Sequence, residues 1–97
     1  GQNYEQSHSF TQSRLFAGIV DNWHADRQLA AVRVRNRLEK GNWLELVTPA
    51  KTVPFKLSEM YDTEGKPIDV AHGGGPDVLL ALPEEPQPFS LLRKIVN

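Results

Sequence analysis

Five residues in the middle of the chain carry side chains suited to contacting a nucleic acid: Arg33, Arg35, Arg37, Lys40 and Trp43. Arginine and lysine bind phosphate oxygens, and an aromatic ring can stack on a base. Arg33 and Arg35 are two residues apart, so on a strand their side chains point to the same side. The pattern predicts either a contact with RNA or a partner, or a solvated face partly neutralised by Asp26, Glu39 and Glu45.

No other group of residues has the spacing of a catalytic or metal-binding site. The chain has no cysteine, which excludes disulfides, thiolate iron–sulfur ligation and cysteine nucleophiles within it. His8, His24 and His72 each lack a second ligand at metal-site spacing and are interpreted as solvated. We therefore predict no catalytic, metal-binding or cofactor-binding residue in this chain.

Two further motifs have a structural interpretation. The carboxylates around residues 59–69 flank a turn that also contains Lys66, which indicates a solvated acidic loop rather than an acid–base pair: Glu59, Asp62, Glu64 and Asp69. The segment His72–Pro76 (HGGGP) lacks the Lys-Ser/Thr of a phosphate-binding loop and the serine turn of a hydrolase. It is predicted to be a flexible hairpin loop.

Length and composition predict one small domain. The chain has 97 residues, with 11 basic and 12 acidic side chains, so a globally basic nucleic-acid-binding domain is not indicated. No apolar run is long enough to span a bilayer, and the polar start of the chain does not have the pattern of a signal peptide. The absence of cysteine fits a cytoplasmic protein.

The elements that would position these residues are short strands. Residues 1–14 are predicted to be an extended or disordered lead-in, followed by a single domain over residues 15–97. Apolar alternation and turn residues predict strands over 15–20, 29–35, 43–48, 53–57, 67–71 and 77–82. Residues 83–88 contain three prolines and are predicted to be a stiff linker, whereas 89–96 fit a strand and a short helix equally well.

The predicted fold class is all-β. About six short strands joined by Gly, Pro, Asn and Asp turns indicate a small closed or nearly closed antiparallel β-barrel. Closure would also remove the exposed strand edges that favour aggregation. A two-sheet sandwich is the alternative.

Four segments, in order, resemble the C-terminal domain of the collagenase-like peptidases, family U32. Arg35-Asn36-Arg37 matches the basic–Asn–basic core of one family segment, and Gly41, Leu44 to Leu46 and Pro49 fall in its register. The other similar segments are Ala17–Val20, Met60–Ala71 and Pro88–Arg93. Asn42, Trp43 and Leu38 depart from the residues usual in the family, but these changes preserve the apolar alternation.

The resemblance implies a β-barrel similar to the second domain of elongation factor Tu, behind a larger catalytic region. In that family the catalytic residues and the cysteines associated with an iron–sulfur cluster belong to the upstream region. Relatives with this domain arrangement are linked to hydroxylation of uridine in tRNA, and the family takes its name from collagenase-like activity. No family site residue maps onto this cysteine-free chain.

We therefore expect a non-catalytic accessory domain of an enzyme of this family, either a peptidase or a tRNA-modifying protein. It would help to cover the active region or to position a macromolecular substrate, such as tRNA. Its expected partners are the upstream catalytic region and tRNA. The residues expected to contact RNA or a partner are Arg33, Arg35, Arg37, Lys40 and Trp43. The alternative is a module for docking or dimerisation that binds no nucleic acid. No membrane partner is expected.

Overall fold

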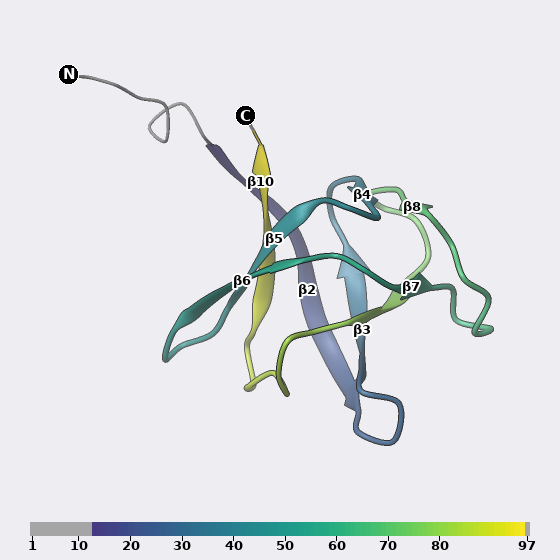
Figure 1. The fold of residues 1–97 in the computed structure, drawn as a ribbon, viewed down its shortest axis with the longest axis horizontal. Coiled ribbons are helices and arrows are strands. Elements are labelled where there is room, and N and C mark those ends of the chain that lie inside the picture. The colour runs from purple at the N-terminus through teal and green to yellow at the C-terminus, as the bar shows by residue number, and fades with distance from the viewer. Residues whose placement is uncertain (1–12, 97) are drawn as a thin grey trace.

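The computed structural model describes residues 13–96, which form β-strands joined by turns and contain no helix (Figure 1). The strands are β2 (Ser13–His24), β3 (Leu29–Val34), β4 (Leu38–Glu39), β5 (Trp43–Val47), β6 (Thr52–Lys56), β7 (Met60–Tyr61), β8 (Val70–Ala71), β9 (Val78–Ala81) and β10 (Leu91–Val96). The all-β prediction is confirmed.

Seven strands form one antiparallel sheet in the order β6-β5-β10-β2-β3-β9-β7. β4 and β8 make a separate two-stranded ladder, in which Leu38 lies opposite Ala71. The last strand, β10, inserts between β5 and β2, so the two ends of the described chain lie side by side (Figure 1). This arrangement brings residues from both ends of the sequence next to the central basic stretch.

The sheet forms a half-barrel, and the predicted closed or nearly closed barrel of about six strands is wrong in this detail. The edge strands β6 and β7 are not paired with each other, so the seven-stranded sheet stays open. They are nevertheless joined by only Leu57, Ser58 and Glu59, a link that spans at most about 15 Å. In a flat seven-stranded sheet the edges would lie about 29 Å apart, so this short link requires strong curling.

The concave side of the curled sheet holds the core. Alternate residues of the neighbouring strands point into it, and the buried positions include Val32, Leu44, Leu46, Leu80 and Leu92, each fully shielded from water. Burying one such side chain stabilises the fold by about 1.5–3 kcal/mol. The residues between these positions on β5, β10, β2 and β3 point to the other side of the sheet.

Each of the six predicted ranges overlaps an observed strand, but the range 67–71 does so only at Val70–Ala71. β4 was not predicted, and Met60–Tyr61 forms a separate strand, β7, outside the predicted ranges.

Three further differences concern the end of β2 and the two ends of the chain. β2 continues to His24, beyond the predicted end of its strand at Val20, so the loop to β3 is shorter. Residues 91–96 form a strand rather than a helix, because β10 pairs with both β5 and β2. Residues 1–12, most of the predicted lead-in, lie outside the described residues, and Ser13 and Arg14 belong to β2.

The predicted turn at Gly41 sets the start of β5. Gly41 has φ of +95°, a left-handed conformation that glycine adopts at little cost, and its N–H donates to the carbonyl of Leu57 at 2.8 Å. The Asn42 side chain accepts the N–H of Glu39 at 2.9 Å. These bonds fix the position at which Trp43 leaves the turn.

Candidate nucleic-acid interface

Two of the five predicted contact residues lie together at the end of β3. Arg33 is exposed and pairs with Asp21 of β2, with 3.1 Å between Nη2 and Oδ2. Arg35 follows β3, is also exposed, and has no ion-pair partner among residues 13–96. Its backbone N–H donates to the carbonyl of Ala17 at 2.8 Å, which holds this segment against β2.

Arg37 and Lys40 lie on either side of β4, and both make ion pairs. Arg37 contacts Glu39 at 3.3 Å, and Lys40 contacts Asp69 at 3.7 Å. The carbonyl of Arg37 accepts a hydrogen bond from Lys94 Nζ at 2.7 Å, which ties this connection to β10. Exposed ion pairs of this kind are weak, so both cations remain able to exchange partners.

Trp43 lies apart from the arginines. It begins β5, is 53% exposed, and lies opposite Lys56 of β6. The strands β10 and β2 separate β5 from β3, which places the β5 and β3 backbones about 14 Å apart. The structure therefore joins Arg33 to Arg35 but does not bring Trp43 to them.

Trp43 and Arg33 belong to a larger surface, which we call the outer face. Cross-strand partners share one side of a sheet, and the registers place three rows across it. Two rows are paired throughout: Glu45, Arg93 and Phe16; and Val47, Leu91, Ile19 and Arg33. The third row is Trp43, Ile95 and Arg14, in which Ile95 pairs with Arg14 and Trp43 lies on the same side by alternation along β5. Only Trp43 and Arg33 of these ten residues were predicted as contact residues.

An ion-pair cluster lies at the centre of the outer face. Glu45 is 8% exposed, and its carboxylate contacts Arg93 Nη2 at 3.1 Å and Arg14 Nε at 3.4 Å. Arg93 lies directly opposite Glu45 in the register, whereas Arg14 reaches it from the neighbouring row. One carboxylate between two guanidinium groups leaves one positive charge unneutralised.

The sequence contained a signal for these missed residues. Arg93 and Ile95 are two residues apart and Leu92 precedes them, so a strand over this segment would place both on the side opposite the buried Leu92. Because residues 89–96 also fit a short helix, the sequence alone did not assign these two side chains to a sheet face. Arg14 was assigned to the lead-in, although β2 begins at Ser13.

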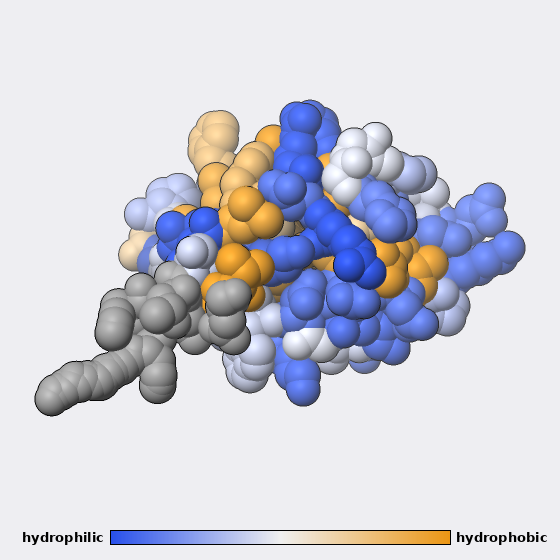
Figure 2. Space-filling view, turned by 90° about the horizontal axis from the view of Figure 1, so that it is seen from above, coloured by the Kyte–Doolittle hydropathy of each residue, from blue (hydrophilic) through white to orange (hydrophobic). Residues whose placement is uncertain are grey.

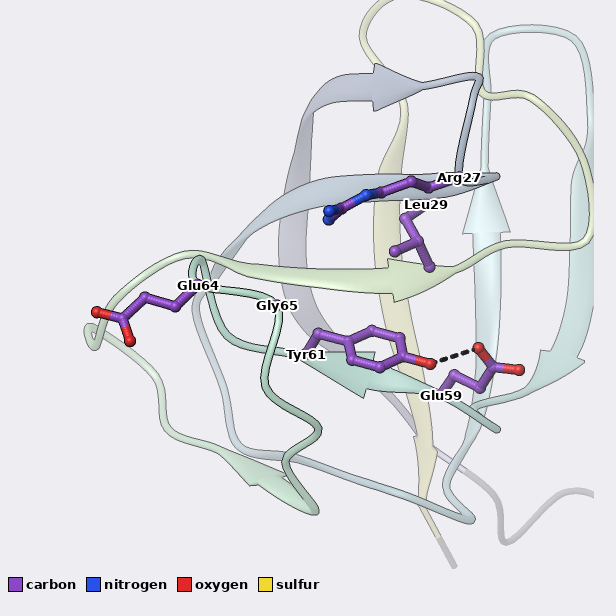
Figure 3. Close-up of a pocket in the computed structure, with 6 residues that line it drawn as sticks. All are labelled: Arg27, Leu29, Glu59, Tyr61, Glu64 and Gly65. Carbon is purple, nitrogen blue, oxygen red and sulfur yellow. Dashed lines mark hydrogen bonds between the residues drawn. The ribbon is translucent and has the colours of Figure 1, made fainter.

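The predicted acidic loop contributes to a pocket beside β7 (Figure 3). The pocket has a volume of about 330 Å³ and is lined by Arg27, Leu29, Glu59, Tyr61, Glu64 and Gly65. The Tyr61 hydroxyl donates to Glu59 Oε1 at 2.8 Å. This hydrogen bond, together with partial burial and the charge of Glu59, raises the pKa of Tyr61 above its ordinary value of 10.0.

The other acidic residues of this loop have structural contacts. Asp62 Oδ1 accepts the backbone N–H groups of Glu64 and Lys66, each at 2.9 Å, and so closes the turn. Asp69 pairs with Lys40. No group of three or more His, Cys, Asp or Glu side chains in the described part of the chain could hold a metal ion.

The glycine motif supports the basic segment. The N–H of Gly74 donates to the carbonyl of Val34 at 3.0 Å, and a Cβ on Gly73 would lie 2.4 Å from the carbonyl oxygen of Arg35. The loop therefore packs directly against the backbone that carries Arg35, and only glycine fits at residue 73. His72 is exposed within it, and His8 lies outside the described residues. No helix in residues 13–96 is long and apolar enough to cross a membrane.

Comparisons with known proteins place this fold in a family. Two curated relatives, both named tRNA hydroxylation protein P, match 87% of the chain: the Escherichia coli protein at 35% identity and the Haemophilus influenzae protein at 30%. The chain spans only 18% of the length of either relative.

Solved structures share the fold. Two crystal structures of the C-terminal domain of a Geobacillus thermoleovorans protein, described as a U32 peptidase, superpose with a TM-score of 0.75. One of them, a selenomethionine variant, is 24% identical and aligns with 81% of this chain and 98% of its own. The other is 23% identical and aligns with 82% and 91%. Residues 12–93 match the model of one family, and the chain belongs to it: the peptidase family U32 C-terminal domain.

Proposed function

We propose that this domain is a non-catalytic accessory part of a longer U32-family protein that acts on tRNA, and that it helps to position the tRNA. The similarity to two proteins named tRNA hydroxylation protein P supports this substrate class. On this proposal the protein is cytoplasmic and the catalytic residues lie in another part of the polypeptide. The chain has no cysteine, so the iron–sulfur ligands that the family resemblance implies are not in it.

The observation that carries the proposal is the pair of arginines at the end of β3. Arg35 is exposed and has no acidic partner among the described residues, so its guanidinium is free to contact a phosphate. Arg33 is 52% exposed, and releasing it from Asp21 would cost no more than about 1 kcal/mol. Arg37 and Lys40, on the connection that follows, extend the same basic segment.

The test is a tRNA titration of the full-length protein at several salt concentrations. For Arg33→Ala/Arg35→Ala we expect weaker binding at low salt. The slope of log affinity against log salt should also fall by about 2, one for each lost phosphate contact. The matched control is Arg27→Ala/Lys51→Ala, which removes the same charge from residues outside the basic segment and should leave the slope unchanged.

Two results would contradict the proposal. The first is wild-type affinity and slope in Arg33→Ala/Arg35→Ala. The second is an equal loss in Arg27→Ala/Lys51→Ala, since that would indicate attraction by total charge rather than by these arginines.

A further inference from the structure

The outer face exposes an apolar surface that the arginine contacts leave unused. Phe16 is 41% exposed and Trp43 is 53% exposed. The four aliphatic residues of the same face are only partly buried: Ile19, Val47, Leu91 and Ile95. Figure 2 shows apolar residues gathered at the end of the molecule where β2 begins and β10 ends. We propose that this apolar part of the outer face docks, within one polypeptide, onto the larger region that precedes the domain.

The inference rests on the proposed function, because it takes the domain to be an accessory part of a longer protein. The family is described as a C-terminal domain, and the chain spans only 18% of each curated relative. Most of such a protein therefore lies outside the segment matched here. A preceding region is covalently connected to the domain, so its contact with the outer face is intramolecular. Its effective concentration at that face is therefore higher than that of a separate molecule.

The position of β2 favours this occupant. The first four residues of β2, Ser13 to Phe16, are all exposed, and two of them belong to the outer face. The larger region would connect to Ser13 through residues 1–12, so its connection enters the domain beside the surface that it would cover. Phe89 is also an exposed aromatic, at 92%, but it lies in the loop before β10 and outside the three rows.

The ion-pair cluster defines the chemistry of the partner surface. Glu45 neutralises one of its two arginines, and the side chains of Arg14 and Arg93 remain 39% exposed. An apolar surface that also carries one carboxylate would cover the aromatic residues and balance the remaining charge. Aromatic anchors beside arginines are typical of the residues that contribute most to binding energy at interfaces.

The test is hydroxyl-radical footprinting of the full-length protein and of the isolated domain. The experiment reads the modification rates of Phe16 and Trp43, with Phe89 as an internal exposed aromatic. We expect both rates to fall at least fivefold in the full-length protein, at every protein concentration and without tRNA, while Phe89 stays unchanged. Crystal structures of a relative's C-terminal domain alone show that this fold can be studied in isolation.

Substitutions then test the contact itself. In full-length Trp43→Asp we expect Phe16 to become as reactive as in the isolated domain, and in Phe16→Asp we expect the same of Trp43. Phe89→Asp is the control and should leave both residues protected. Circular dichroism confirms that each variant is folded, and the two reciprocal variants protect the test against misfolding of either one.

Three outcomes would overturn the inference. Equal rates in the domain and the full-length protein would mean that nothing covers the face. Protection lost on dilution would assign it to a second copy, and protection seen only with tRNA would assign it to RNA. Arg33→Ala/Arg35→Ala separates this inference from the proposed function: it should weaken tRNA binding and leave the footprint unchanged.

Discussion

The outer face and the pocket beside β7 present opposite chemistry on one small fold. The outer face combines aromatic residues with arginines, and its members come from both ends of the chain and from the middle. The pocket has two carboxylates, Glu59 and Glu64, against one cation, Arg27, and most of its residues come from the single segment 59–65. The outer face, with three arginines and one glutamate, attracts phosphate, whereas the excess of carboxylates in the pocket repels it. The nearly balanced charge of the whole chain does not reveal this local difference.

The largest difference in stability should come from two glycines, one packed against the basic segment and one in the pocket. Gly73→Ala places a Cβ 2.4 Å from the Arg35 carbonyl oxygen, and we expect a loss of about 2–3 kcal/mol in the free energy of unfolding. Gly65→Ala in the pocket meets open space and strains only its φ of +88°, at a cost of about 1 kcal/mol. Urea denaturation of both variants measures the difference. A neutral Gly73→Ala would contradict the close approach of the loop.

A second comparison uses one carboxylate from each region. Glu45→Ala leaves Arg14 and Arg93 without their shared partner, and we expect the free energy of unfolding to fall by about 1–2 kcal/mol. The loss is smaller than at a fully buried ion pair, because both arginine side chains are partly exposed. Glu59→Ala removes an exposed carboxylate and should cost less than about 0.5 kcal/mol. Chemical denaturation checks both. Equal losses would mean that the cluster does not stabilise the outer face.

A third comparison concerns affinity for tRNA. Asp21→Asn frees Arg33 from its ion pair, so we expect tRNA to bind about two- to fivefold more tightly. Glu59→Gln removes the same charge from the pocket and should leave the affinity within experimental error. Filter binding at low salt measures both. Weaker binding by Asp21→Asn would show that Asp21 orients Arg33 productively.

The smallest expected effect is confined to the pocket. The Glu59 hydrogen bond raises the pKa of Tyr61, so the folded protein holds the phenolic proton more tightly than the unfolded chain does. Its contribution to stability is complete below about pH 10 and is lost as pH rises through the raised pKa. Glu59→Gln should lower the Tyr61 pKa, as measured by phenolate absorbance. An unchanged pKa would show that the hydrogen bond is not formed.

The sequence predicted the inner face of the sheet better than the outer face. Alternation identified β3 and β5, because Val34, Leu44 and Leu46 must all point to one core. Two features required the structure. The edges β6 and β7 stay unpaired, and Glu45 meets Arg93 and Arg14 only through the insertion of β10 between β5 and β2. Strand order and register are long-range properties, and local periodicity does not specify them.

Long-range strand order also decides which of the predicted contact residues come together in the fold. Arg33 and Arg35 are predicted together because they alternate on one predicted strand, over 29–35, and in the fold Arg33 lies on β3 while Arg35 directly follows it. Trp43 follows Arg35 by only eight residues in the sequence, but two strands lie between β5 and β3. Proximity along the chain was therefore a reliable guide within a strand and an unreliable one across a turn.

The most direct test of the central claim is a nuclear magnetic resonance titration of the isolated, ¹⁵N-labelled domain with tRNA at low salt. We predict that the largest shifts will occur at the amides of residues 33–37 and at Gly74, which donates to the carbonyl of Val34, and that the amides of the Tyr61 pocket will stay unchanged. Saturating tRNA that shifts no amide in residues 33–37, or that shifts the pocket instead, would contradict the account.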